Sequence, residues 1–206
     1  MPTKFILSFF RVSVTILFYL LIAFTLFILV ASLVSITSGN NQKLTNFTYS
    51  YEAMIFRKGN QELPFTYAAD STVRYHPLPN RYQLQVEPRS AIGYYAFISK
   101  LIFLGLGIAV LWHFKKIFQQ TDLSHPFSYS IIRRLKILAA LFIIADVLGL
   151  INYFMFNNYL NQAIAAPHMQ LVTKFGDDLI TGCIIWIIAV VYERGIVLQE
   201  ENALTV

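Results

Sequence analysis

Among the charged residues inside otherwise apolar stretches of this sequence, the first candidates for chemistry are Lys100, Asp146, Asp177 and Asp178. A charge at the middle of a bilayer costs on the order of 3 kcal/mol, so such residues pair with one another or mark a path for protons or ions. At ~1.5 Å per helical residue, Lys100, Asp146 and Asp178 would lie roughly 12, 15 and 10 Å from the same membrane surface. We therefore expect Lys100 to face Asp146, with Asp178 or Asp177 as a second acceptor.

This charge cluster allows a functional and a structural interpretation. In the functional one, the residues form a relay for protons or ions. In the structural one, Lys100 extends outward to the headgroups and Asp177 and Asp178 lie in the headgroup layer. Asp146 is then protonated or paired, and only fixes helix packing. The small number of helices favours the structural interpretation.

Other patterns of enzymatic or metal-binding residues are missing from the sequence. No H-E-x-x-H, G-x-S-x-G or phosphate-binding glycine loop occurs. The histidines are scattered without the spacing of metal ligands: His76, His113, His125 and His168. Cys183 is the only cysteine, which excludes a disulfide within the chain. We expect a protein that is not an enzyme and that binds neither a metal nor another cofactor.

The composition is that of a membrane protein. Of the 206 residues, 56% are hydrophobic and only 13% are charged, and the mean hydropathy is +0.56. Soluble domains carry about 25% charged residues, so the deficit argues against a water-soluble globule. The net charge of +5 could suggest nucleic acid as a partner. Bases that flank membrane spans explain it better in so apolar a chain, and we expect no direct nucleic-acid binding.

Four apolar runs are each long enough to cross ~30 Å of hydrocarbon as a helix. The first lacks charged residues and histidine throughout, exceeds the ~7–15 residues of a signal-peptide core and precedes no clean cleavage site, so we expect an uncleaved anchor. Such long runs do not suit barrel strands. We expect an all-α integral membrane protein with one membrane domain over residues 1–206 and spans at about residues 12–36, 91–114, 135–156 and 171–192.

Small residues four positions apart mark places where helices can approach closely. Two such pairs occur in the predicted spans: Gly105 with Ala109, and Ala145 with Gly149. This spacing is common by chance in apolar helices, and it predicts packing without implying chemistry.

The distribution of Lys and Arg predicts the orientation. Lys4 and Arg11 precede the first span, five bases lie around the connection between the second and third, and residues 157–170 contain none. By the positive-inside rule, both termini and the 115–134 loop face the cytoplasm. Residues 37–90 would then lie outside, since loops of that length weigh less in the rule. We expect a multi-pass protein of the cell membrane, in contact with the lipid bilayer.

The long segment over residues 37–90 has the pattern of short strands. Tyr49 and Tyr51 alternate with polar residues, and Tyr82, Leu84 and Val86 do so again. Alternating aromatic residues bounded by Gly, Asn and Pro are typical of strands. We expect a small β-rich extracytoplasmic insertion between the first two helices, packed on the helix ends because it is marginal alone.

The cytoplasmic side offers two candidate contact segments. Pro126 and Phe127 precede a basic stretch that includes Arg133 and Arg134. That stretch is either a basic anchor at the foot of the third helix, which we favour, or a contact for a partner. The predicted cytoplasmic tail, residues 193–206, is a frayed helix end or a ligand for a partner, and its charged candidates are Glu193, Arg194, Glu200 and Glu201.

These same segments resemble a bacterial family of uncharacterised four-helix membrane proteins, domain of unknown function 2975. The resemblance lies in Pro126-Phe127-Ser128, Arg134-Leu135-Lys136, Asp178-Leu179-Ile180-Thr181-Gly182, Glu193-Arg194-Gly195, Leu198, Glu200-Glu201-Asn202 and Leu204-Thr205-Val206. It is best over the second half of the chain, and Ala203 departs from it where such tails usually carry an acid. It implies an integral membrane protein of bacteria, often encoded beside a small helix-turn-helix regulator, with no known activity or catalytic residue.

Three roles fit these features. The first is a membrane sensor that regulates a cytoplasmic partner, such as a DNA-binding regulator, through the 115–134 loop and the tail. The second is a small transporter or channel component with a Lys/Asp relay. The third is a structural subunit whose helices pair with another membrane protein.

Overall fold

Four long helices dominate the computed structural model, which describes residues 2–37, 49–55, 66–67, 74–75, 81–86, 90–121, 128–163 and 169–204. The helices are α1 (Pro2–Thr37), α2 (Ala91–Gln120), α3 (Tyr129–Ala163) and α4 (Asp177–Leu204). All four are long and apolar enough to cross a membrane. Even α4, with 28 residues, extends over ~42 Å, more than the ~30 Å of a hydrocarbon layer. The predicted count of four helices long and apolar enough to span a membrane is confirmed for the described residues.

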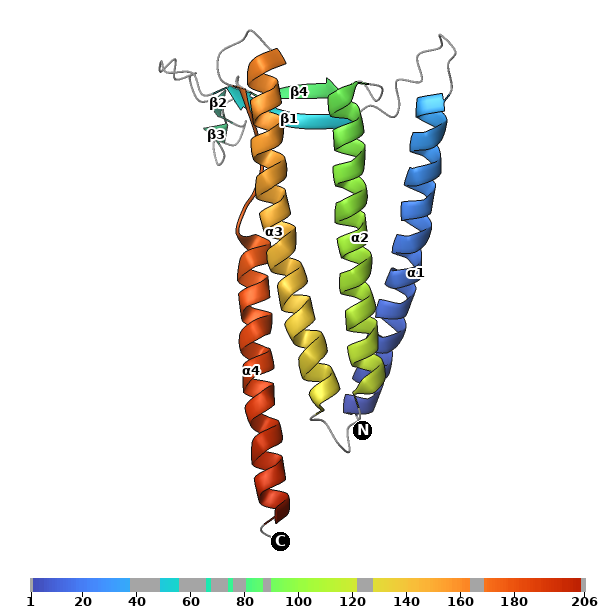
Figure 1. Ribbon diagram of the computed structural model, residues 1–206, viewed down its shortest axis with the longest axis vertical. Coiled ribbons are helices and arrows are strands. Elements are labelled where there is room, and N and C mark those ends of the chain that lie inside the picture. The colour runs from blue at the N-terminus through green and yellow to red at the C-terminus, as the bar shows by residue number, and fades with distance from the viewer. Residues whose placement is uncertain are drawn as a thin grey trace.

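The helices form a row in which each packs on the next one along the chain (Figure 1). The strands gather at one end of this row, and both chain termini lie at the other (Figure 1). Side chains of α1 in the described part of the chain are all at least partly exposed, and many large apolar ones are more than half exposed. The helix row therefore offers a wide apolar surface to its surroundings.

The start of α4 differs from the prediction, which set the fourth span at residue 171. Residues Met169–Leu171 form strand β5 instead, and α4 begins at Asp177. Gly176, just before the helix, has a φ of +95°, a left-handed conformation that favours glycine and interrupts a regular helix. A short segment such as residues 169–172, which is apolar except for Gln170, does not by itself distinguish a strand from a helix. Asp177 and Asp178 are consequently the first two residues of α4, and not seven residues inside it.

The largest sheet joins two connections that are far apart in the sequence. Strand β1 (Tyr49–Ile55) lies in its middle, antiparallel to β4 (Arg81–Val86) on one edge and to β5 on the other. A second, two-stranded sheet pairs β2 (Thr66–Tyr67) with β3 (Arg74–Tyr75). The strands expected between the first two helices are present. The third strand of the larger sheet, however, comes from the connection between α3 and α4.

The three-stranded sheet packs on the ends of α2 and α3. A buried cluster joins Val86 of β4 to residues of both helices: Ile92, Ala96, Phe156 and Leu160. The ring of Tyr51 in β1 lies 4.4 Å from that of Phe156, which is only 1% exposed. A sheet this small has too little core to be stable alone, and the helix ends supply the apolar surface that it needs.

Among the described glycines, Gly182 marks the closest approach, between α3 and α4. A Cβ atom on Gly182 would lie 2.8 Å from the Ala139 carbonyl oxygen and 2.9 Å from Cγ1 of Ile143. Gly105 and Gly149, which the spacing of small residues suggested for close packing, would have nothing within 4 Å of such an atom. The spacing alone does not identify the contact because it says nothing of which face a neighbouring helix covers.

We expect Gly182→Ala to lower the free energy of unfolding by about 1–3 kcal/mol, because the added methyl forces α3 and α4 apart. Thermal unfolding of the full chain in detergent measures this effect. Gly149→Ala is the matched control, since its methyl has open space and gains up to about 1 kcal/mol in helix propensity. Equal stability of the two variants would contradict the close contact.

Candidate functional site

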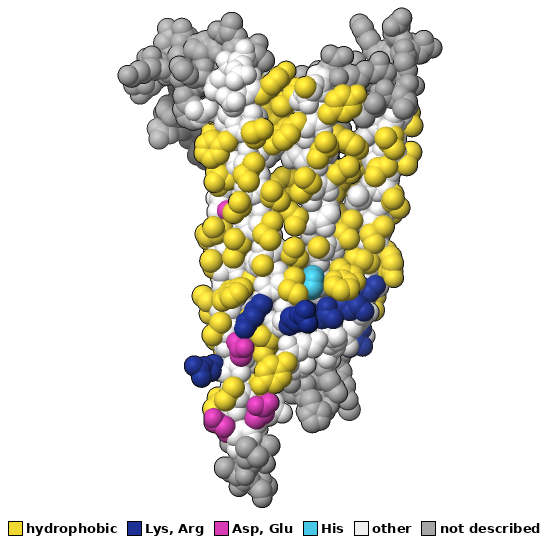
Figure 2. Space-filling view, viewed as in Figure 1, with side chains coloured by type: hydrophobic (Ala, Val, Ile, Leu, Met, Phe, Trp, Pro, Cys, Tyr) yellow, Lys and Arg dark blue, Asp and Glu magenta, His cyan; other side chains and the backbone are white. Residues whose placement is uncertain are grey.

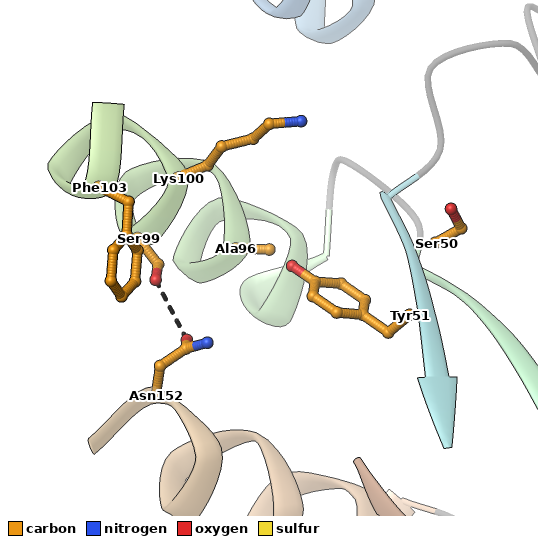
Figure 3. Close-up of a pocket in the computed structure, with 7 residues that line it drawn as sticks. All are labelled: Ser50, Tyr51, Ala96, Ser99, Lys100, Phe103 and Asn152. Carbon is orange, nitrogen blue, oxygen red and sulfur yellow. Dashed lines mark hydrogen bonds between the residues drawn. The ribbon is translucent and has the colours of Figure 1, made fainter. Parts of the chain in front are cut away.

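A pocket of about 350 Å³ opens between β1, α2 and α3, beneath the three-stranded sheet. Its walls come from three separate parts of the chain (Figure 3). The lining residues are Ser50 and Tyr51 of β1, Ala96, Ser99, Lys100 and Phe103 of α2, and Asn152 of α3. Pockets that hold small ligands have volumes of roughly 300–1,000 Å³, so this one falls at the lower end of that range.

One face of α2 supplies most of the pocket. The lining positions on α2 follow a 3-4-7 spacing, which places their side chains along one side of a helix. The helix starts at a capped end, where the hydroxyl of Ser90 accepts a 3.1 Å hydrogen bond from the backbone N–H of Gly93. Ile92 and Ala96 are buried against the sheet and fix the rotation of the helix about its axis. Lys100 and Phe103 are held at the pocket as a result.

The polar groups of the pocket can donate hydrogen bonds. Ser99 Oγ donates to Asn152 Oδ1 over 3.1 Å, which orients the amide so that its nitrogen lies on the pocket side (Figure 3). The hydroxyl of Tyr51 points from β1 toward Ala96 (Figure 3). Ser50 and Lys100 complete the lining, with the Lys100 ammonium directed away from Ser99 and Asn152 (Figure 3), and the lining contains no Asp or Glu. The polar groups that converge are therefore hydroxyls and an amide.

Asp146 belongs to a different site, at the start of α4. Both its carboxylate oxygens accept from the backbone N–H of Gly176, at 3.1 and 3.2 Å. Gly176 is the residue that caps α4, since its carbonyl accepts the helical hydrogen bond from Ile180. A carboxylate at this position satisfies an N–H that the helix leaves unpaired and interacts favourably with the positive end of the helix dipole.

The expected contact between Lys100 and Asp146 is therefore corrected. Asn152, which lies at the level of Lys100 through its bond to Ser99, is six residues further along α3 than Asp146, or ~9 Å along the axis. Asp146 faces α4, and the described residues join it only to Gly176. The two residues are not at equal depth, because α3 continues to Ala163, past the predicted end of the span at residue 156, and Asp146 therefore lies further from that end of the helices than the sequence estimate placed it.

Asp177 and Asp178 lie in the first turn of α4 and are exposed. Acidic residues are stabilised there by the helix dipole, and solvent or headgroups can hydrate them. The structure thus brings the three aspartates to the start of α4 and places Lys100 in a separate pocket.

Basic residues form a band across the helices near the end that holds the termini (Figure 2). Its members are Arg11, Lys115, Lys116, Arg133, Arg134 and Lys136. Arg11 donates two hydrogen bonds, of 3.2 and 3.0 Å, to the carbonyl of Phe118 near the end of α2, where a cation is favourable. Lys115 donates to Tyr19 Oη over 3.3 Å, and Arg134 donates to Gln120 Oε1 over 2.8 Å. The band holds α1, α2 and α3 together.

The predicted tail is helical, because α4 continues to Leu204 and extends past the basic band (Figures 1 and 2). Lys136 and Glu193 form an ion pair of 2.9 Å, and Tyr129 donates a weaker 3.5 Å bond to Glu200. Ile196 is buried at 5% exposure beside the start of α3. Up to about residue 196, the segment is therefore part of the fold.

The rest of the surface formed by the start of α3 and the end of α4 carries exposed charges. The candidate contact residues Arg133, Arg194, Glu200 and Glu201 are exposed, as are the apolar Val197 and Leu198. Pro126 and Phe127 lie outside the described residues. The described candidates thus lie together at one end of α3 and α4.

The sequence did not identify the uncharged residues of the pocket as parts of a site. Ser50, Tyr51, Ser99 and Asn152 carry no charge and occur in no motif. Two features of the sequence were weak indications of a polar site. Asn152 is a strong hydrogen-bonding group within the third apolar run, and Ser99 is adjacent to Lys100 in the sequence. Only the fold brings them to one cavity, because each comes from a different segment.

Comparison with known proteins gives one family. The model of the family described as "Protein of unknown function (DUF2975)" matches residues 62–206. The match confirms the resemblance found in the sequence, and it includes β2 to β5 and the last three helices. No curated protein and no solved structure matches the chain. Helix α1 and strand β1 lie outside the matched range.

We expect Asp146→Leu to reduce the free energy of unfolding by about 1 kcal/mol, since the N–H of Gly176 loses its acceptor. Asp146→Asn keeps one oxygen acceptor and should lose less. The double variant with Lys100→Leu tests the separation of the two sites, and its loss should equal the sum of the single losses within about 0.5 kcal/mol. Chemical or thermal unfolding in detergent measures all four, and a coupling above about 1 kcal/mol would show that Lys100 and Asp146 interact after all.

Proposed function

We propose that this chain, which belongs to the family of proteins of unknown function DUF2975, is a multi-pass membrane protein that senses a ligand at one end of its helices and regulates a protein at the other. The role is non-enzymatic. The pocket receives the signal, and the end of α3 and α4 with its exposed charges delivers it.

The proposed orientation follows from the basic band. Lys and Arg are enriched at the cytoplasmic side of membrane proteins, and here they lie at the end that holds both termini (Figures 1 and 2). Both termini are then cytoplasmic, and the sheets and the pocket face the outside of the cell membrane. Trp112 supports this placement, because its ring lies 5.9 Å from Lys116 Nζ and 5.5 Å from Arg134 Cζ, where aromatic belts meet the headgroups.

One observation carries the sensing role: the strand that lines the pocket and the strand that leads into α4 belong to the same sheet. β1 lines the pocket with Ser50 and Tyr51, and it pairs with β5 through Ala53 opposite Leu171. The backbone N–H of Val172, which follows β5, donates to the Glu52 carbonyl over 2.9 Å. Only residues 172–176 separate β5 from α4. A displacement of β1 on ligand binding would therefore be transmitted to the start of α4 through these hydrogen bonds and a short connection.

The output surface offers charge of both signs. Acidic side chains lie beyond the basic band (Figure 2), and Glu200 and Glu201, near the end of α4, are exposed. Such a surface selects a partner by charge complementarity and speeds encounter more than it raises affinity. The proposed partner is a cytoplasmic DNA-binding regulator, which the family resemblance suggests.

The exposed apolar face of α1 favours a second candidate role, as a structural subunit. None of its described side chains is buried, so another membrane protein could pack there. A transporter with a Lys/Asp relay is less well supported. Asp146 is engaged in the α4 cap, and Lys100 lies in a separate pocket.

The orientation predicts opposite labelling of the two ends. Starting from Cys183→Ser, which removes the only cysteine, single cysteines are introduced by Asn161→Cys at the sheet end of α3 and Gln199→Cys on α4. Both positions are exposed. In intact cells, a membrane-impermeant maleimide should label position 161 and reach position 199 only after lysis. The reverse pattern would refute the proposed orientation.

Truncation after Val197 should abolish capture of the cytoplasmic partner. This truncation keeps the buried Ile196 and the ion pair of Glu193, so the fold is retained. The full chain is purified from native membranes, and co-purified proteins are quantified against the truncated chain and against Glu200→Gln with Glu201→Gln. The double substitution should reduce capture about tenfold or more, if each lost charge contact is worth roughly 1 kcal/mol.

Two other results would overturn the regulatory role. One is enrichment of membrane proteins alone, unaffected by the truncation, which would favour a structural subunit. The other is a proton or ion flux in liposomes that Asp146→Asn removes, which would favour a transporter.

A further inference from the structure

We infer that two copies of this chain pair in the membrane through α4 and the segment that precedes it, residues 172–176. This surface carries charges of both signs inside the apolar layer, and a second copy supplies the opposite charges. The inference goes beyond the proposed regulatory role, and it holds whichever end of the helices faces the cytoplasm. It depends on the depth of the segment, its polar groups and the exposed face of α4.

The connection between β5 and α4 runs alongside α3 at the depth of the apolar layer (Figure 1). Its end at α4 is fixed by the hydrogen bonds between Gly176 and Asp146. Asp146 lies ten residues along α3 from Lys136 of the basic band and ten from Phe156, which packs on the sheet. Each interval is ~15 Å of helix, and together they equal the ~30 Å of a hydrocarbon layer. The start of α4 is therefore near the middle of that layer.

The segment presents unpaired backbone at this depth. Residues 172–175 are exposed and belong to no helix or strand. In the described part of the chain, the backbone groups of Thr173, Lys174 and Phe175 make no hydrogen bond. Backbone outside regular structure is tolerated at membrane depth only where protein covers it or where it lines a water-filled cavity. Protein or water must therefore cover this segment in the membrane.

The exposed charges beside the segment complement one another. Lys174 lies within the segment, and Asp177 and Asp178 follow in the first turn of α4. All three are exposed, and their side chains form no ion pair among the described residues. Hydrating them would draw water or headgroups into the apolar layer, which costs free energy. In a two-fold pair the same patch meets itself, so Lys174 of each copy can pair with an aspartate of the other.

The outer face of α4 continues this surface toward the basic band. Residues seven positions apart are buried on the face toward α3: Gly182, Ala189 and Ile196. Side chains that are more than half exposed follow one another on the opposite face at intervals of four, three and four residues: Ile180, Ile184, Ile187 and Val191. This spacing is typical of helices that pair along a shared seam. The apolar side chains alone would suit lipid equally well, and the charges at their start favour a second α4.

Disulfide cross-linking in native membranes tests this inference. Starting from Cys183→Ser, single cysteines are introduced by Val191→Cys on the exposed face and by Val190→Cys as the matched control. Both valines are exposed at a similar depth. With copper(II) phenanthroline as the oxidant, Val191→Cys should form a species of twice the 23.6 kDa chain mass. Its yield should be about fivefold higher than that of Val190→Cys, which points ~100° away around the helix. Equal yields from the two positions would overturn the inference.

Charge variants in the Val191→Cys background test the pairing at the start of α4. Lys174→Glu places like charges opposite one another and should lower the cross-linked fraction about tenfold. Lys174→Arg keeps the charge and should stay within about twofold of the parent. Combining Lys174→Glu with Asp177→Lys restores both signs and should recover most of the yield. No loss in Lys174→Glu, or an equal loss in Lys174→Arg, would overturn the inference.

Two other results would identify a different cover for the segment. Rapid labelling of Thr173→Cys by a hydrophilic methanethiosulfonate in native membranes would show that the segment lines a water-filled cavity. A cross-linked species of another mass from Val191→Cys would show that a different membrane protein packs on α4. Either result would overturn the pairing of two copies.

Discussion

In an apolar layer about 30 Å thick, every polar group of a protein needs a partner within the protein itself. This constraint accounts for the long helices, whose backbone groups pair along their own length. It also accounts for hydroxyls inside them: Thr15 and Thr25 each donate to the carbonyl four residues earlier. Ser99 with Asn152 and Asp146 with Gly176 follow the same rule between helices. The polar side chains at depth are thus part of the architecture before they are candidates for function.

Composition was enough to predict the four helices, because an apolar run of twenty or more residues has few alternatives. The strands at Tyr49–Ile55 and Arg81–Val86 were also accessible, from the alternation of Tyr51, Leu84 and Val86 with polar residues. The start of α4 could not be predicted from the sequence, since it depends on the positive φ of Gly176 and on the pairing of β5 with a strand more than a hundred residues away. The partner of Asp146 could not be predicted for the same reason.

The pocket was beyond prediction in a different sense. Lys100 was identified by its charge, but its neighbours Tyr51 and Asn152 come from a strand and a helix that only the fold brings together. The close contact at Gly182 was likewise hidden among other glycines, because the contacting face of α4 is set by packing. Residue type indicated which helices carry polar side chains, whereas their level along the helix axis and their direction around it required coordinates.

The placement of β1 between β4 and β5 has a consequence for the order of assembly. Its neighbour β4 is synthesised soon after it, but β5 follows only when α2 and α3 have been made. One edge of β1 therefore cannot pair with β5 until translation has nearly reached the end of the chain. Pairings between segments so distant in sequence form slowly. The three-stranded sheet is thus completed only after α2 and α3 have been made, and its closure marks a chain whose first three helices are present.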